Sequence, residues 1–293
     1  MPEQDRETVL VTGCSSGLGR ALCEALHGVK SNYGARAYRV FSTARDVDRI
    51  QDLAAKGMEA LPLDVCSADS VSACVAELKR KADKTDILIA NAGVLRVMPL
   101  IEQPLEDIRD VLETNVVGVM RIVQAVVPDM IKRRKGTVVI IGSVSGYLTT
   151  PFGGIYSGSK ACVHALADSL RMELHPFNVN VLYVEAGAFK SSLAANGASS
   201  LNLPSDSLYK SVKSSIDRRL QIGQMSSDHT AEMTAKQIVA AMREDPPPFK
   251  VKAGGKAGYY KFVGLLATYI APGLIFNKLC RMFGLADMKK ALE

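Results

Sequence analysis

Short apolar runs rich in Val and Ile recur along the chain, separated by longer stretches with helical periodicity. Such runs between helices are typical of strands buried on both faces, as in parallel sheets covered by helices. The sequence therefore predicts an α/β fold: a single Rossmann-like domain with a doubly wound parallel sheet and a helical C-terminal extension. The expected strands are 8–12, 38–43, 58–63, 86–90, 136–141 and 179–184, with a final edge strand at 249–253.

The longest helices are expected at about 104–134 and 155–174, with shorter ones at 17–26 and 231–244. No linker separates two domains, so residues 1–255 are predicted to form one nucleotide-binding domain. Within it, residues 188–229 are rich in Ser, Ala, Asn and Lys, which is typical of a flexible flap over a substrate. Residues 256–293 form the apolar and basic extension.

A glycine-rich turn follows the first expected strand and opens the first helix, with the spacing G-x-x-x-G-x-G. Glycines permit a tight turn and let a pyrophosphate approach the backbone, while the helix N-terminus supplies positive potential. The turn therefore predicts a dinucleotide site rather than a plain glycine turn. Its expected cofactor-binding residues are Gly13, Ser15, Ser16, Gly17, Leu18 and Gly19.

Arg45 follows the second expected strand, where an acidic residue would bind the ribose 2′-hydroxyl of NAD. A guanidinium there can instead pair with the 2′-phosphate of NADP. Asp46 and Asp48 come slightly later and are expected to begin the next helix. The predicted cofactor is NADPH/NADP+.

Tyr156 and Lys160 stand four residues apart on an expected helix, thirteen residues after Ser143. Positions i and i+4 share a helix face, and a nearby cation lowers a Tyr pKa from its reference of about 10. The pair can then act as a general acid/base. By itself the spacing is more typical of a solvated Tyr and Lys on a helix.

The motifs together resemble the short-chain dehydrogenases/reductases over about residues 8–190. The resemblance implies hydride transfer with Asn115, Ser143, Tyr156 and Lys160 as catalytic residues, Asn115 holding a water that relays protons. The resemblance also implies that Tyr156 and Lys160 contact the cofactor and that Ser191 takes the place of the Thr usual in the family's carboxamide site. The motifs differ from the family pattern at Ala90 and Ala186. The further cofactor-binding residues implied are Asp64, Val65, Asn91, Ala92, Gly93, Gly187 and Ser191.

The charge is concentrated at the C-terminal end, since residues 249–293 hold eight Lys or Arg against Asp287 and Glu293. A basic, apolar tail favours a membrane surface over nucleic acid. The fifteen uncharged residues 262–276 are short of the ~20 needed for a span and are interrupted by Pro272-Gly273. Two short helices are expected, which bind a membrane, cap the substrate pocket or bury in a dimer.

The six scattered cysteines form no C-x-x-C pair and no cluster with histidines, so neither a metal site nor a disulfide framework is expected. The charged N-terminus has no secretory h-region. We therefore expect a cytosol-facing protein, peripheral on endoplasmic reticulum or lipid droplets, with a soluble cytoplasmic protein as the alternative. A homodimer is a further expectation from the family.

Segments 151–160 and 173–181 resemble the NADPH-dependent 1-acyldihydroxyacetone-phosphate reductases, which implies reduction of a lipid ketone. Residues 13–17 and 44–46 resemble retinol and 17β-hydroxysteroid dehydrogenases, the alternative reading. A catalytically silent NADP(H)-binding scaffold or sensor is an alternative of another class. Candidate cations for a substrate phosphate are Arg96, Lys190, Lys210 and Lys213.

Overall fold

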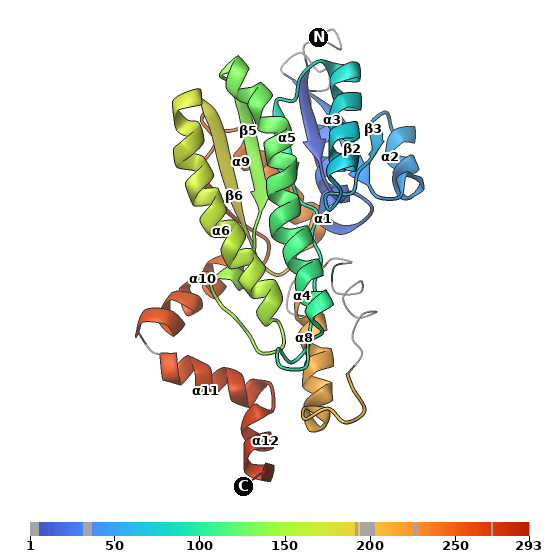
Figure 1. Ribbon diagram of the computed structural model, residues 1–293. Coiled ribbons are helices and arrows are strands. Elements are labelled where there is room, and N and C mark those ends of the chain that lie inside the picture. Colours follow the sequence, from blue (N-terminus) through green and yellow to red (C-terminus); the bar gives the residue numbers. More distant parts are fainter. Residues whose placement is uncertain are drawn as a thin grey trace.

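A parallel sheet of seven strands runs through the molecule with helices on both faces, as the computed structural model shows (Figure 1). The structure describes residues 6–31, 37–190, 193, 203–225, 228–270 and 272–292. The strand order is β3-β2-β1-β4-β5-β6-β7, and each neighbouring pair is parallel. The predicted fold class is confirmed. The strands are β1 (Glu7–Val11), β2 (Tyr38–Ala44), β3 (Glu59–Pro62), β4 (Ile87–Ala90), β5 (Gly136–Ile141), β6 (Val179–Ala186) and β7 (Lys250–Ala253).

Helices cover the sheet in two layers, because strand side chains alternate between its faces. Val9 and Val11 point to the layer of α1 and α9, while Leu10 between them points to the layer of α3, α5 and α6. All three side chains are fully buried. The longer helices are α1 (Gly17–Gly28), α3 (Ala68–Ala82), α4 (Leu105–Leu112), α5 (Gly118–Arg133), α6 (Gly154–Leu174), α8 (Lys213–Met225) and α9 (Ala231–Met242). The short ones are η2 (Val47–Ile50), α2 (Gln51–Ala55), η3 (Glu113–Val117), η4 (Val144–Gly146), η5 (His175–Phe177) and η6 (Lys210–Val212).

Strand β1 lies between β2 and β4, so the chain winds outward to β3 and then crosses back to β4. This reversal is the topological switch point of an open α/β sheet. Ligands bind in the crevice outside the carboxyl ends of the strands at such a point. The fold therefore brings the residues that follow β1, β2, β4, β5 and β6 to one edge.

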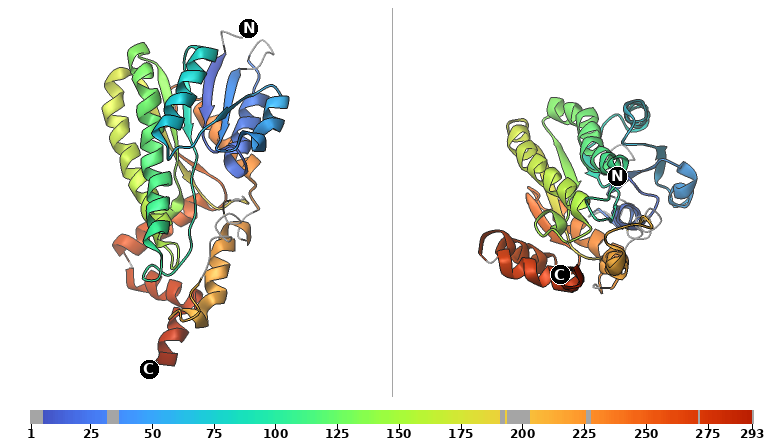
Figure 2. Two further views of the ribbon diagram at one scale, coloured as in Figure 1. Left: turned by 45° about the vertical axis from the view of Figure 1, so that its right-hand side comes forward. Right: turned by 60° about the horizontal axis from the view of Figure 1, so that its bottom comes forward.

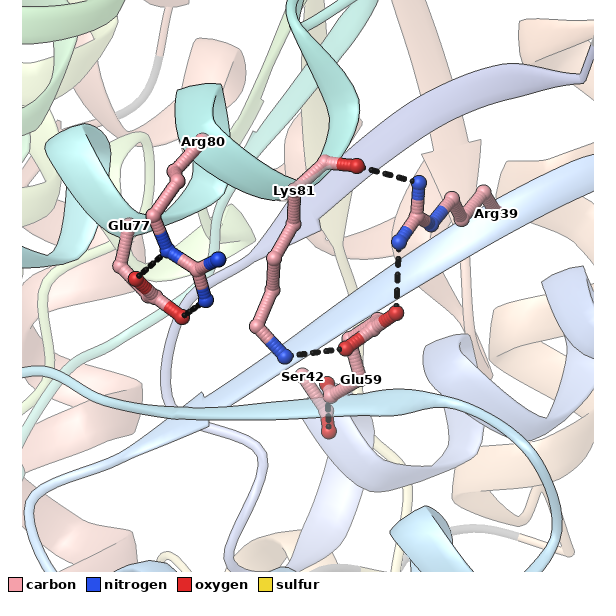
Figure 3. Close-up of polar contacts among 6 residues, drawn as sticks. All are labelled: Arg39, Ser42, Glu59, Glu77, Arg80 and Lys81. Atoms are coloured by element: carbon pink, nitrogen blue, oxygen red, sulfur yellow. Dashed lines mark hydrogen bonds and ion pairs between the residues drawn. The ribbon is translucent and has the colours of Figure 1, made fainter. Parts of the chain in front are cut away.

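The outer edge of the sheet is tied to α3 by a polar cluster (Figure 3). Arg39 of β2 donates to Glu59 Oε1 of β3 and to the Lys81 carbonyl of α3, both at 2.7 Å. Lys81 Nζ completes the cluster with a 2.8 Å bond to Glu59 Oε2. Partly exposed ion pairs contribute about 1 kcal/mol or less each. The main effect of the cluster is therefore to hold β3 in register with β2, and its contribution to stability is small. Asp64 comes two residues after the end of β3.

The run α4–η3–α5 forms one continuous helix interrupted by the π-helical turn η3. Among the described residues, this run (Leu105–Arg133) is the one helix that is long and apolar enough to cross a membrane. Its apolar side chains, among them Ile122 and Met130, pack in the core against the sheet. The run is therefore a core helix of the α/β sandwich, as the sequence predicts.

The segment predicted as an irregular flap, 188–229, instead contains the regular helix α8. Ile216 and Leu220 of α8 pack in a separate apolar cluster with Phe152 and Phe283. Since Phe152 and Phe283 are distant in sequence, composition alone did not reveal this helix.

The described residues of the C-terminal extension form three α-helices and a π-helical turn after β7, where two helices were expected. They lie at the end of the molecule opposite the N-terminus, beyond the carboxyl ends of the strands (Figures 1 and 2). The extension is therefore next to the crevice of the sheet. It comprises α10 (Ala257–Leu265), the π-helical turn η7 (Leu266–Ile270), α11 (Pro272–Met282) and α12 (Leu285–Leu292).

Candidate active site

A cavity of about 1110 Å³ opens at the carboxyl ends of the strands. It collects nearly all the residues that the sequence singles out. Asn115 does not line it, and Ser191 lies outside the described residues. The predicted residues that line it are Gly13, Ser15, Ser16, Gly17, Leu18, Gly19, Arg45, Asp64, Val65, Asn91, Ala92, Gly93, Ser143, Tyr156, Lys160 and Gly187.

The glycine turn forms one end of this cavity, which we call the cofactor end. Gly13 has φ +72°, and a Cβ on Gly19 would lie 2.2 Å from the Gly13 carbonyl oxygen, so only glycine fits. Asn91 holds the turn in place, since its Nδ2 donates to the carbonyls of Thr12 at 2.8 Å and Gly13 at 3.1 Å. Helix α1 therefore presents its N-terminus to the cavity, an arrangement suited to a pyrophosphate.

Two guanidinium groups follow β2 at the cofactor end. Arg45 is exposed and lines the cavity, and Arg49 lines it as well. Asp46 is directed elsewhere, because its Oδ1 accepts a 3.1 Å bond from Asp48 N and caps η2, as expected. Arg49 was missed because nothing in its spacing marks it. The glycine turn, the helix N-terminus and the two cations fit a phosphorylated dinucleotide.

Tyr156, Lys160 and Ser143 meet deeper in the cavity. Tyr156 lies in the first turn of α6, and Lys160 Nζ lies 5.9 Å from the centroid of its ring. Lys160 also donates a 2.8 Å bond to the Ile141 carbonyl at the end of β5. Ser143 follows β5, and its Oγ accepts a 3.1 Å bond from Ser145 N. The Ser143 side chain also shares a hydrogen bond with Tyr156, so the two hydroxyls lie side by side.

The pKa values of this group differ from the sequence expectation. Burial raises the pKa of Tyr156, although its hydrogen bond with Ser143 and the charge of Arg219 act to lower it. Burial also lowers the pKa of Lys160 to about 8. The sequence predicts that Lys160 favours the phenolate, and in the structure the charge of Arg219 acts in that direction. The difference arises because Lys160 is directed to the Ile141 carbonyl, while Arg219 comes from a helix that sequence did not predict.

Asn115 is fully buried in the π-helical turn η3 and acts beside the cavity. Its Oδ1 accepts a 2.8 Å bond from Val94 N, and its Nδ2 donates to the Val94 carbonyl and to Ser159 Oγ, both at 3.0 Å. The amide therefore joins the loop after Gly93 to α6, three residues beyond Tyr156. Its role in a water relay stays a prediction.

Arg219 is a site residue that sequence reasoning missed. It lies on α8, is 9% exposed and lines the cavity. Its Nε donates a 2.7 Å bond to Thr150 Oγ1, and its guanidinium lies so close to Gly153 that a Cβ there would be 2.6 Å from Nη2. No local pattern marks it, because residues 188–229 read as a flap.

The other end of the cavity, which we call the substrate end, is lined mainly by apolar side chains. Several of them come from α10 and α11, so the C-terminal extension caps the site. These apolar residues are Leu95, Leu148, Phe189, Val263, Ile275, Leu279 and Met282. Lys278 of α11 adds an exposed cation at the rim.

Comparison with known proteins places this site in a family. The family model described as short chain dehydrogenase matches residues 7–201, which include the glycine turn and the Ser143, Tyr156 and Lys160 group. The chain belongs to the short-chain dehydrogenase family. It is therefore an NAD(P)-dependent oxidoreductase, and the implied activity class is confirmed.

Individual members of the short-chain dehydrogenase family cover most of the chain. The NADPH-dependent 1-acyldihydroxyacetone phosphate reductase of Schizosaccharomyces pombe is 33% identical over 69% of this chain and 67% of its own. Human retinol dehydrogenase 8 is 37% identical over 61% of this chain and 58% of its own. A crystal structure of a short-chain dehydrogenase from Streptomyces avermitilis is 29% identical, with a TM-score of 0.77 over 94% of this chain and 97% of that chain.

Proposed function

We propose that this protein reduces the ketone of an acylated dihydroxyacetone phosphate with NADPH, forming a 1-acylglycerol 3-phosphate. The observation that carries the proposal is the composition of the cavity. Its cofactor end holds Arg45 and Arg49, and its substrate end is apolar. The group Ser143, Tyr156 and Lys160 lines the same cavity. The similarity to the yeast reductase supports the same reading.

The cofactor end suits NADPH in particular. Arg45 and Arg49 can bind a 2′-phosphate through charge-assisted hydrogen bonds, and no acidic residue of η2 lines the cavity to bind a free ribose hydroxyl. Asp64 and Val65 would contact the adenine side, and Gly93 the nicotinamide side. Gly187 and Ser191 follow β6 and would hold the carboxamide.

The catalytic step follows from the residues around Tyr156. When bound, the cofactor supplies the hydride. The neutral Tyr156 phenol donates its proton to the carbonyl oxygen, and its raised pKa keeps this acid protonated at neutral pH. The Ser143 hydroxyl donates to the same oxygen and stabilises the developing negative charge. Lys160 would hold the nicotinamide ribose and, through Asn115, restore the proton.

A panel of carbonyl substrates tests this proposal. NADPH oxidation should be fastest with palmitoyl dihydroxyacetone phosphate, and Tyr156→Phe should lower kcat by at least about 100-fold while leaving the Kd for NADPH nearly unchanged. Turnover of retinal or a ketosteroid in preference to the acylated phosphate would refute the assigned substrate. Substantial residual activity of Tyr156→Phe would refute the assigned acid.

A retinol or hydroxysteroid dehydrogenase is the second candidate. The similarity to human retinol dehydrogenase 8 and the apolar substrate end favour it. The same panel separates the two candidates, since retinal and steroids carry no phosphate. A silent scaffold is the least favoured reading, because such a protein has no need to keep Asn115, Ser143, Tyr156 and Lys160 together.

We also propose that the outer face of the C-terminal extension binds the cytosolic surface of the endoplasmic reticulum or of lipid droplets. This face exposes large apolar side chains that do not line the cavity, while the inner face of the same helices does line it. A lipid substrate could then pass from the membrane to the cavity between them. The exposed apolar residues are Phe262, Leu265, Tyr269, Ile270, Leu274 and Phe276.

A further inference from the structure

Arg219 is a buried cation in the substrate end of the cavity. Within the described part of the chain, its one hydrogen-bonding partner is Thr150 Oγ1, and no carboxylate pairs with it. A guanidinium has five N–H donors, so four remain for a ligand. Burying an unpaired charge is costly, and such groups are kept where a ligand neutralises them.

The position of Arg219 relative to Tyr156 limits what this ligand can be. The guanidinium lies against Gly153, the N-cap of α6, and Tyr156 comes three residues later on the same helix. Arg219 and Tyr156 both line the cavity, and the charge of Arg219 acts on the Tyr156 phenol. The N-terminus of α6 adds positive potential at the same place.

The surroundings of Arg219 are otherwise apolar. Its neighbours on α8, Ile216 and Leu220, pack with Phe152 and Phe283. A charge in such surroundings is screened little by solvent, so its attraction for an anion is stronger than that of a surface lysine.

The cations that the sequence suggested for a phosphate are less suitable. Arg96 lines the cavity but pairs with Asp107 at 3.3 Å and Asp110 at 3.6 Å. Lys213 pairs with Asp217 at 2.9 Å, and Lys210 donates to the Ser205 carbonyl. Lys190 does not line the cavity.

We infer that Arg219, with the N-terminus of α6 and the Thr150 hydroxyl, binds a phosphate monoester of the substrate and so places the neighbouring ketone at Tyr156. The inference rests on the proposed function and extends it, because it requires the anion to lie within a few atoms of the reacting carbonyl. An uncharged retinoid or steroid would leave Arg219 buried and unpaired. Arg219 is therefore the residue that determines specificity for a charged ketone.

A matched pair of substrates tests this inference. The wild-type enzyme should reduce palmitoyl dihydroxyacetone phosphate with a kcat/KM at least about 10- to 100-fold above that for palmitoyl dihydroxyacetone, the size expected for charge-assisted hydrogen bonds. Arg219→Met should abolish this preference by acting on the phosphorylated ketone alone, and Arg219→Lys should restore part of it. Arg218→Met, which removes an exposed guanidinium of the same helix that does not line the cavity, should change neither value.

A binding measurement makes the outcome independent of the reaction. Calorimetry on the NADP+ complex should show that dodecyl phosphate binds at least about 10-fold more tightly than dodecanol, and that Arg219→Met removes the difference. If Arg219→Met weakens the binding of dodecyl phosphate and dodecanol equally while NADP+ binding is intact, Arg219 only shapes the cavity. That result would overturn the inference. Phosphate binding that depends on Arg219 without reduction of the acylated phosphate would instead refute the proposed function alone.

Discussion

Lys261 of α10 donates a 2.6 Å hydrogen bond to Oε1 of Glu185, a residue of β6 that is 1% exposed. Tyr147 donates its hydroxyl to the same oxygen at 2.8 Å. The C-terminal extension is thus attached to the central sheet by a contact with a buried carboxylate. Glu185 lies directly before Ala186 and Gly187, which line the cavity, so this contact links the cap to the candidate active site.

Lys261→Met should therefore destabilise the protein, because it leaves the buried Glu185 carboxylate without its cation. Removing one partner of a buried pair costs up to 3–5 kcal/mol, but the Lys261 side chain is 28% exposed, so we expect about 1–3 kcal/mol. The double variant Lys261→Met/Glu185→Gln should lose less than the single variant. Urea denaturation measures the free energy of unfolding of both variants. An equal loss of stability in the single and the double variant would show that the Lys261–Glu185 pair does not stabilise the cap.

Arg45→Ala should weaken NADPH binding by about 10- to 100-fold, because it removes charge-assisted hydrogen bonds to the 2′-phosphate. Binding of NADH, which has no such phosphate, should stay within about twofold of the wild type. Fluorescence titration with each cofactor gives both Kd values. Arg80→Ala, which removes an exposed guanidinium of α3 that does not line the cavity, is the matched control. Tighter binding of NADH than of NADPH by the wild type would contradict the assignment.

Lys160 should make stability depend on pH in the cofactor-free protein. Its pKa is about 8 in the folded chain against 10.5 for the free side chain. Between these values the unfolded chain binds more protons, so the free energy of unfolding should rise with pH. The full shift corresponds to about 3 kcal/mol.

Below pH 8 both states carry the proton, and the cost of burying the charge lowers the stability of the fold. Lys160→Met removes this titration. The difference in the free energy of unfolding between wild type and variant should therefore change with pH between about 8 and 10.5 and stay constant below pH 8. Chemical denaturation at a series of pH values gives the difference. Lys213→Met should retain the wild-type slope, and a flat difference for Lys160→Met across the whole range would show that Lys160 is not buried as a free amine.

Tyr269→Ser and Ile270→Ser should each reduce binding to anionic lipid vesicles, because these side chains are 79% and 73% exposed on the outer face of the extension. Burial of apolar area in the lipid interface provides the attraction. Co-sedimentation of the full chain with vesicles measures the effect. Met172→Ser on α6, where the side chain is 70% exposed, is the matched control. Unchanged sedimentation of both C-terminal variants would place any membrane contact elsewhere.

The sequence alone predicts the sheet, because each strand is a short run of apolar residues that can be recognised from its own residues without knowledge of the rest of the fold. Each end of all seven predicted strands lies within two residues of its observed position. The glycine turn and the Tyr156–Lys160 spacing are equally local, since one turn or one helix face contains each of them. The order of the strands then brings these motifs to one edge, as the parallel fold requires.

Tertiary structure decided the features that depend on residues far apart in the chain. Arg219 contacts Thr150 across 69 positions, and Lys261 contacts Glu185 across 76. Neither contact leaves a pattern in the local sequence. The region of α8 was therefore predicted as a flap, and the C-terminal helices were left with three alternatives, namely binding a membrane, capping the pocket or forming a dimer. The pKa of Tyr156 belongs with them, because it depends on burial and on which cation the fold brings near. The sequence identified the candidate catalytic group, and only the packing of α8, α10 and α11 around it decided the cavity in which that group lies.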